Sequence, residues 1–121
     1  MSEDNVLYLK KPKRFTLDEA KKLLEQVRAI THEAVEKVEP YILKIQSPEL
    51  SESARTSIAE EVQTHVDDWT DRIMKLGAVP KGLWLVDFDS GAGYYCWQYN
   101  EEELGFFHGY DQSFTNRTPI Q

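Results

Sequence analysis

The C-terminal third of the chain contains three aromatic-rich stretches: GLWLVDF at residues 82–88, YYCW at 94–97 and FFH at 106–108. Short runs of apolar, β-branched and aromatic residues that are bounded by turn residues are typical of β-strands. The turn residues here are the Gly- and Ser-containing segment 89–93 and the acidic segment 100–103. This pattern predicts a three-stranded antiparallel meander. The predicted strands are 83–88, 94–99 and 104–110.

Two long helices are predicted before this sheet. Thr16 and Glu19 match a capping box, in which each side chain accepts a hydrogen bond from the other residue's backbone N–H, so the first helix begins there. Apolar residues then recur at alternating steps of three and four, which indicates one stripe on a long helix. The stripe consists of Leu17, Ala20, Leu24, Val27, Thr31, Ala34, Val38, Tyr41 and Ile45. Thr31 interrupts its apolar character, and Pro40 predicts a kink or a local break.

A second amphipathic helix is predicted to end near Leu76, because Gly77 follows it at the position where helices commonly stop. The connection between the helices is short, so they should pack antiparallel. The fold class is therefore α+β: a long antiparallel helical hairpin followed by a small three-stranded antiparallel β-meander packed against it. The expected limits are a flexible N-terminal tail at 1–13 and a single domain at 14–121, with the hairpin at 16–77 and the sheet and C-terminal segment at 82–121.

Length and composition restrict the class of protein. With 121 residues, 40% of them hydrophobic, the chain fits one soluble domain with a modest core. It has no apolar run of transmembrane length and no secretory signal pattern, and its single cysteine excludes an internal disulfide. We therefore expect a cytoplasmic protein with no membrane partner. The net charge is −7, and residues 82–121 carry one basic side chain against six acidic ones, which predicts no nucleic-acid partner.

The predicted turns also determine which side chains share a face of the sheet. They place Val86 opposite Tyr95, and Tyr95 opposite His108. Cys96 and His108 then point to opposite faces, and only a one-residue bulge would bring them together. Zinc needs several ligands around one point, and the chain has neither CxxC nor HExxH spacing. The sequence therefore predicts no stoichiometric metal and no cofactor.

Six residues are candidates for a ligand-binding or functional cluster. They are Glu19, Asp87, Cys96, Trp97, His108 and Arg117. Asp87 ends an apolar run and needs a partner, so an ion pair of Arg117 with Asp87 or with a glutamate is favoured over a substrate-binding arginine. For Cys96 and His108, a small buried thiol and a hydrogen-bonded core histidine are favoured over a reactive thiol and a ligand or general base. The capping box is the first explanation of Glu19, and a role as an acid or a metal ligand is only secondary.

Residues spread along the chain also match a known family pattern. They are Phe15-Thr16-Leu17-Asp18-Glu19-Ala20, Leu76-Gly77, Gly82-Leu83, Val86-Asp87-Phe88, Cys96-Trp97, His108, Phe114, Arg117, Pro119 and Ile120. In these residues the chain resembles the uncharacterised prokaryotic family called domain of unknown function 2203, over residues 14–120. It departs from the family pattern at Phe107, Ser113 and Asn116, where the family often has Trp, Gly and Gly. The resemblance supports the fold and brings no established activity.

Two functions are compatible with the sequence. The first is a non-enzymatic protein-interaction module that is homodimeric through its helices, because the helical stripe is longer than three short strands can cover. The alternative is a small metal- or ligand-binding protein, such as a hydrolase, with a site around Asp87, His108 and Arg117. The first is favoured, since it rests on features that are present in the sequence, whereas the second needs a convergence that spacing does not show. Neither an enzyme class nor a partner other than a second copy of the chain follows from the sequence.

Overall fold

Helix α2 spans Leu17–Ile45 in the computed structural model, which describes residues 13–120. Thr16 Oγ1 accepts a hydrogen bond from the Glu19 N–H at 3.1 Å, and Glu19 Oε1 accepts one from the Thr16 N–H at 2.9 Å, so the predicted capping box is confirmed. Pro40, where the sequence predicts a kink or a local break, lies inside this one helix. The predicted break is absent because the loss of one N–H donor does not end a helix that packs along a second one.

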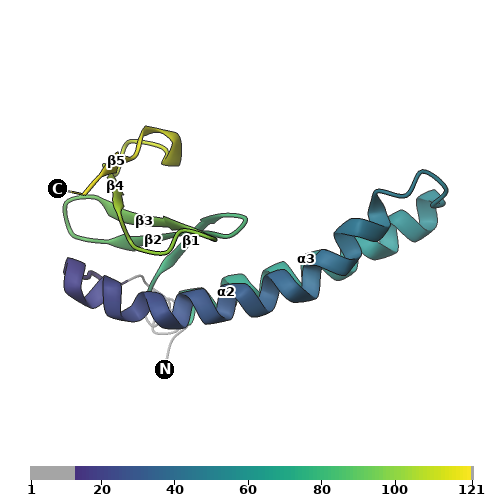
Figure 1. Ribbon diagram of the computed structural model, residues 1–121, viewed down its shortest axis with the longest axis horizontal. Helices are drawn as coiled ribbons and strands as arrows, with labels where there is room; N and C mark the ends of the chain where they lie inside the picture. The colour runs from purple at the N-terminus through teal and green to yellow at the C-terminus, as the bar shows by residue number, and fades with distance from the viewer. Residues whose placement is uncertain (1–12, 121) are drawn as a thin grey trace, which may run out of the picture.

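Helix α3 spans Glu52–Lys75 and returns antiparallel to α2 (Figure 1). It ends as predicted at Gly77, whose φ of +92° is a left-handed conformation that favours glycine. The helix–helix interface also explains the polar exception in the α2 stripe. Thr31 is fully buried, and its Oγ1 accepts a hydrogen bond from Trp69 Nε1 at 2.9 Å. The hydroxyl thus satisfies a buried indole N–H that an apolar residue would leave without a partner.

An antiparallel sheet follows the hairpin, which confirms the predicted α+β class. Its strands are β1 at Val79–Gly82, β2 at Leu85–Asp89, β3 at Tyr94–Gln98, β4 at Phe106–His108 and β5 at Thr118–Pro119, and a 3₁₀ helix, η1, spans Phe114–Asn116. The strands lie in sequence order, so the sheet is a simple meander. The three predicted strands are present but shorter, and β1 and β5 add one strand at each edge. Figure 1 shows the sheet lying over one end of the hairpin, whose other end extends well beyond it.

The two faces of the sheet have different surroundings. Val86, Phe88 and Trp97 are fully buried against the helices and form one core cluster with Phe15, Leu24 and other helical residues. The strand residues that alternate with them point to the opposite, outer face. Asp87 and Cys96 lie on this outer face and are also fully buried. The outer face of the sheet is therefore also covered by other parts of the protein, and an aspartate is among its buried residues.

The pairing of β3 with β4 differs from the predicted register by one residue. Tyr94 lies opposite His108 and Cys96 lies opposite Phe106, so His108 shares the outer face with Cys96. The prediction that Cys96 and His108 point to opposite faces is therefore wrong. The chain turns back early, because the Gln98 N–H donates to Glu101 Oε1 at 2.9 Å and the Gln98 carbonyl accepts from the Glu101 N–H at 3.0 Å. This local pairing ends β3 at Gln98 and moves the register by one residue.

The pairing of β2 with β3 differs by two residues instead. Val86 lies opposite Trp97 and Phe88 lies opposite Tyr95. The turn occupies residues 90–93, whereas the predicted pairing of Val86 with Tyr95 would place it at 89–92. Because side chains alternate with a period of two, a shift of two residues leaves every predicted face unchanged.

Residues 13–15 attach to the edge of this domain. The Lys13 N–H donates to the Gly77 carbonyl at 3.1 Å, and the Phe15 N–H donates to the Asp89 carbonyl at 2.6 Å. The predicted flexible tail, apart from Lys13, lies outside the described residues. Within residues 13–120, neither helix combines the length and the apolar character that a membrane crossing requires.

Candidate functional site

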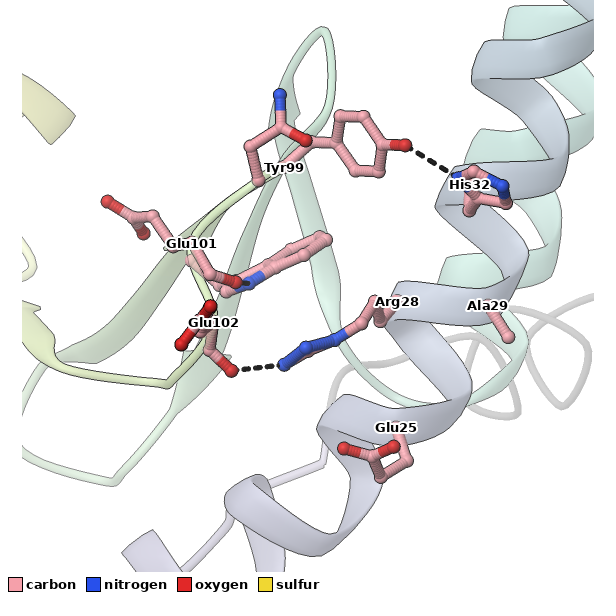
Figure 2. Close-up of a pocket in the computed structure, with 9 residues that line it drawn as sticks. Glu25, Arg28, Ala29, His32, Tyr99, Glu101 and Glu102 are labelled. Carbon is pink, nitrogen blue, oxygen red and sulfur yellow. Dashed lines mark hydrogen bonds between the residues drawn. The ribbon is translucent and has the colours of Figure 1, made fainter.

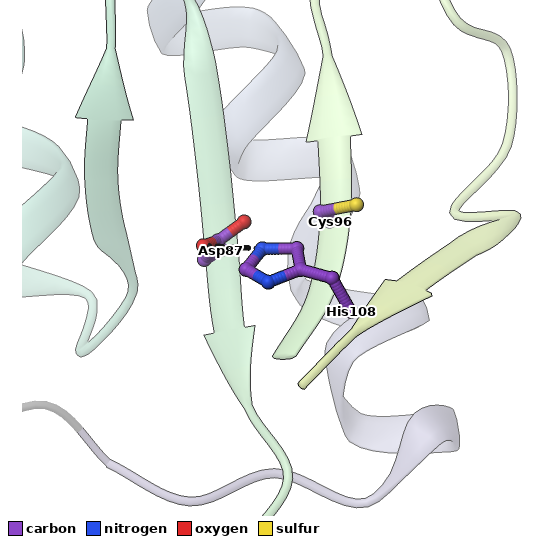
Figure 3. A group of neighbouring side chains, drawn as sticks. All are labelled: Asp87, Cys96 and His108. Atoms are coloured by element: carbon purple, nitrogen blue, oxygen red, sulfur yellow. Dashed lines mark hydrogen bonds and ion pairs between the residues drawn. The ribbon is translucent and has the colours of Figure 1, made fainter. Parts of the chain in front are cut away.

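Asp87, Cys96 and His108 come together on the outer face of the sheet (Figure 3). They belong to three adjacent strands, β2, β3 and β4. One carboxylate oxygen, the Cys96 Sγ and one imidazole nitrogen all lie within 4.8 Å of one another. Asp87 and Cys96 have no exposed surface, and His108 is 3% exposed. The β-pairing therefore assembles three different metal-binding groups in one buried cluster, which we call the Asp–Cys–His cluster.

A glycine helps to position His108 in this cluster. Gly93, in the turn between β2 and β3, lies so close to β4 that a Cβ atom there would sit 2.7 Å from the His108 carbonyl oxygen. Atoms of that kind do not approach so closely, so any larger residue at this position would push the end of β4 away. The absence of a side chain at Gly93 thus allows His108 to pair closely with β3.

The hydrogen bonds of His108 define its proton positions. Nδ1 lies 3.0 Å from the Gly109 carbonyl oxygen, which can only accept, so Nδ1 carries a hydrogen. Nε2 lies 2.9 Å from Asp87 Oδ2, which places one proton between the imidazole and the carboxyl group. Asp87 Oδ1 is buried and has no hydrogen-bond partner among residues 13–120. A buried carboxyl oxygen without a partner costs free energy.

Burial dominates the electrostatics of the cluster. It raises the pKa of the Asp87 carboxyl group, while His108 and the Lys81 ammonium act in the opposite direction. Burial also raises the pKa of the Cys96 thiol to about 11, against the opposing effect of the nearby Arg117 guanidinium. Without a bound cation, Cys96 is therefore a neutral thiol near pH 7. A cation in the cluster would favour the thiolate and the carboxylate together.

A cavity of about 260 Å³ adjoins the cluster. Asp87 and His108 form part of its wall, whereas Cys96 does not. The rest of the wall comes from β1, β2, β3 and the segment that follows β4. The other lining residues are Lys81, Leu85, Tyr94, Tyr110, Gln112, Ser113 and Phe114. The C-terminal segment thus covers the outer face of the sheet and leaves a small, partly open cavity beside two of the three cluster residues.

Arg117 holds this C-terminal segment in place. Its guanidinium group forms two hydrogen bonds to the Glu101 carboxylate, at 2.6 and 3.0 Å, which confirms the predicted pair of Arg117 with a glutamate. The Arg117 Cζ also lies 4.0 Å from the ring centroid of Phe106 and 4.2 Å from that of Phe114. Bidentate pairing and stacking between two rings are interactions that lysine cannot reproduce. Arg117 therefore acts here as a structural anchor beside Cys96.

Comparison with protein families gives a match along nearly the whole chain. Residues 13–120 match the family described as "Uncharacterized conserved protein (DUF2203)". The chain belongs to this family. No curated protein and no solved structure matches it. The family description names no activity, so the function of this DUF2203 protein has to be inferred from its own residues.

The other two predicted site residues of this DUF2203 protein lie away from the cluster. Trp97 points to the helical face of the sheet, where it is fully buried. Glu19 stays at the N-terminus of α2, where the hydrogen bonds from Thr16 lower the pKa of its carboxyl group. Of the six predicted residues, three therefore form the cluster, Arg117 lies beside it, and Trp97 and Glu19 serve the core and the helix cap.

The DUF2203 fold also forms a larger cavity of about 420 Å³ that the sequence did not indicate (Figure 2). It lies between α2 and the connection from β3 to β4. Figure 2 shows His32 Nδ1 hydrogen-bonded to the Tyr99 hydroxyl group at 2.7 Å, and Arg28 donating to the Glu102 carbonyl oxygen. These polar groups bind one another across the cavity. Three of its lining residues are glutamates, which oppose binding of an anion near Arg28.

The chemistry of the Asp–Cys–His cluster distinguishes between two kinds of site. A Cys–His nucleophile pair needs an imidazole nitrogen that accepts the thiol proton. In this protein Nδ1 is bonded to the Gly109 carbonyl and Nε2 to Asp87, so neither nitrogen is free for Cys96. A metal site instead needs one nitrogen held by a carbonyl and the other directed at the remaining ligands, which is the arrangement of His108. The geometry therefore favours a metal centre over a thiol nucleophile.

Proposed function

We propose that this protein is a small metal-binding protein whose centre consists of Asp87, Cys96 and His108. The observation that carries the proposal is the direction of the His108 ring. Its Nδ1–H is fixed on the Gly109 carbonyl, so Nε2 directs its lone pair at a carboxylate that still has one buried oxygen without a partner. Two lone-pair-bearing groups at this distance need a cation between them. In the metal-free protein that cation is a proton, and a metal ion would take its place.

Zinc suits this set of donors best. An imidazole nitrogen, a thiolate sulfur and a carboxylate oxygen are all ordinary zinc ligands, whereas magnesium and calcium prefer oxygen ligands alone. Structural zinc sites are closed by four protein ligands, and catalytic sites have three and leave one position open. The cluster supplies three ligands and adjoins a cavity. This matches an open site, at which bound zinc would activate water for hydrolysis.

Zinc uptake would depend on deprotonation of the protein ligands. The buried Cys96 thiol, with a pKa of about 11, must lose its proton, and the proton between Asp87 and His108 must leave as well. Zinc affinity should therefore fall as the pH is lowered. The proposal also places the protein in the cytoplasm, because a reducing compartment keeps Cys96 available as a ligand.

The proposal is tested by the zinc content of the full-length protein, purified without a tag and dialysed after exposure to zinc. We expect about one zinc ion per chain in the wild type and almost none in His108→Ala, because two remaining ligands do not hold zinc firmly. His32→Ala is the matched control, since His32 is a histidine of the same chain that lies on α2 and is bonded to Tyr99. Wild-type protein without zinc, or equal zinc in both histidine variants, would show that the proposal is wrong.

We propose homodimerisation through the hairpin as a second property of the chain. The part of the hairpin that extends beyond the sheet carries Leu43, which is 69% exposed, next to Ile42, which is 37% exposed. Contact with the same surface of a second copy would bury Ile42 and Leu43, as in other helical dimers. The proposal supports the interaction-module function without excluding the metal site.

The dimer is tested by sedimentation at micromolar concentration. We expect the wild type to sediment as a dimer and Leu43→Glu as a 14.1 kDa monomer, because a buried, unpaired carboxylate opposes association. Leu83→Glu is the matched control, since Leu83 is 54% exposed but lies between β1 and β2, outside the proposed contact surface on α2. If the wild type were monomeric at all concentrations, the proposed dimer would be wrong.

A further inference from the structure

We infer that the metal centre binds a small organic oxyanion, a carboxylate or a phosphate monoester with a compact apolar group, in the cavity of about 260 Å³ beside Asp87 and His108. The inference rests on the proposed metal site and specifies the ligand class that the open side of that site would take. It is drawn from the position of the cavity, its charge, its hydrogen-bond donors and its size.

The cavity lies on one defined side of the cluster. Asp87 and His108 form part of its wall, while Cys96 does not line it and lies near Arg117. A metal ion held by all three residues would therefore have its protein ligands on the sheet side, and the cavity would supply the remaining ligand. An oxygen atom of a small molecule in the cavity would fill this position, as substrate or water does in open zinc sites.

The charge around the cavity favours an anion. Zinc balances the negative charges of the Asp87 carboxylate and the Cys96 thiolate, so these three groups together are neutral. Lys81 then adds a positive charge to the site, because it lines the same cavity as Asp87 and His108. Within residues 13–120 Lys81 forms no salt bridge, and its Nζ lies 4.8 Å from the ring centroid of Tyr94, another cavity residue. An anionic ligand would therefore find a free counter-charge beside the metal.

The remaining wall combines a hydrogen-bond donor with apolar surface. The Gln112 side-chain oxygen accepts a hydrogen bond from the Gly109 N–H at 2.8 Å, so the side-chain NH₂ group is left to donate. Tyr94 and Tyr110 pack edge to face with ring centroids 5.1 Å apart, and Phe114 adds a third aromatic ring. The Tyr110 hydroxyl group is already bonded to Asp89. The cavity thus offers donors to an oxyanion and aromatic surface to the group attached to it.

The size of the cavity limits the ligand. Sites for drug-sized molecules are typically about 300–1,000 Å³, so the space here suits a smaller molecule, such as a single ring with one acidic group. A nucleotide or a peptide is too large to be enclosed in this space. The combination of charge and size therefore indicates a compact organic anion.

The test uses full-length protein loaded with cobalt(II), whose visible absorption reports on the ligands of the metal. Benzoate represents the carboxylates, and phenylphosphonate represents the phosphate monoesters without being hydrolysed. We expect at least one of them to change the cobalt spectrum in a saturable way. Lys81→Met should weaken that binding about tenfold, the effect of removing one partly solvated charge pair, without changing the cobalt content. Lys75→Met is the matched control, because Lys75 lies on α3 and pairs with Asp71.

The outcomes of this titration separate the ligand class, the role of Lys81 and the existence of the metal site. A response to benzoate alone supports a carboxylate ligand, a response to phenylphosphonate alone supports a phosphate ester, and a response to both supports oxyanions in general. Full cobalt loading without a response to either probe would overturn the ligand inference and leave the metal site intact. Equal affinity in Lys81→Met and Lys75→Met would overturn the role of Lys81, and with it the argument from charge. Failure to bind cobalt would overturn the proposed function and this inference together.

Discussion

Replacing Trp97 by alanine should lower the free energy of unfolding by about 3–5 kcal/mol. Trp97 is fully buried between the sheet and the helices, and its Nε1 donates a hydrogen bond to the Glu101 carbonyl at 2.9 Å. Alanine would leave a large cavity in the core and an unpaired carbonyl oxygen in the connection from β3 to β4. Chemical denaturation with urea, monitored by circular dichroism, measures the difference from the wild type.

Leu83→Ala is the control for this comparison, because Leu83 is 54% exposed and its loss should change the free energy of unfolding by less than about 0.5 kcal/mol. If Trp97→Ala instead cost less than about 1 kcal/mol, the tryptophan would have to be solvent-exposed. The assignment of Val86, Phe88 and Trp97 to the helical face of the sheet would then be wrong.

Asp87→Asn should abolish most of the stabilisation by zinc without lowering the stability of the zinc-free protein. With free zinc at 1,000 times its dissociation constant, the wild type should gain about 4 kcal/mol of unfolding free energy. If the loss of the carboxylate weakens binding about 100-fold, the gain at the same zinc concentration falls to about 1.4 kcal/mol. Asparagine has nearly the shape of aspartate, and its NH₂ group can donate to His108 Nε2, so the fold should be retained.

In the absence of zinc, the difference in unfolding free energy between Asp87→Asn and the wild type should depend on pH. Burial raises the pKa of Asp87 in the folded protein above its ordinary value of 3.8. The contribution of this carboxyl group to stability is therefore present below that value and is lost as the pH rises through its folded pKa. Zinc-free Asp87→Asn lacks this loss, so its stability relative to the wild type should increase as the pH rises above 4.

Urea denaturation at several pH values, with and without zinc, gives both results. Asp89→Asn is the matched control, because Asp89 lies on the same strand, bonds Tyr110 and Gly91, and is not part of the cluster. That variant should keep the full zinc effect. An undiminished zinc effect in Asp87→Asn would mean that zinc binds elsewhere in the chain.

The helices and the order of the strands were predictable because their signals are local. The capping box of Thr16 and Glu19 needs only neighbouring residues, and Gly77 stops α3 through its own backbone conformation. The periodic apolar stripe correctly predicted the buried face of α2, including Thr31, although the reason for a threonine there appears only with Trp69. Such long-range partners cannot be recognised from spacing.

The residue types of the site were predicted correctly. The prediction failed only in the register between β3 and β4. Asp87, Cys96 and His108 were among the candidates, but a turn placed at residues 100–103 put His108 on the wrong face of the sheet. The actual turn is set by the Glu101 side chain, which binds the Gln98 N–H. A side chain that competes with the strand ladder in this way is invisible to hydrophobic patterning, and a shift of one residue reverses every side chain of β4.

The two cavities could not have been predicted from the sequence at all. The cavity beside the cluster depends on how the segment after β4 crosses the sheet, which Arg117 determines through Glu101 and two aromatic rings. The second one depends on the docking of the β3–β4 connection against Arg28 and His32 of α2. Both arise from packing between elements that are far apart along the chain.

The short sequence separation within the cluster has a consequence for how the protein folds. Asp87 and His108 are only 21 residues apart, and Cys96 lies between them on the middle strand of the same meander. Closing a loop of 21 residues costs less entropy than closing the 67 residues between His32 and Tyr99, which join α2 to the sheet, so these contacts can form before those with α2. Zinc that is bound at this stage would crosslink β2, β3 and β4 before the long hairpin covers their other face. In that case the ion would act as a folding nucleus as well as a functional centre, and refolding would be faster with zinc than without it.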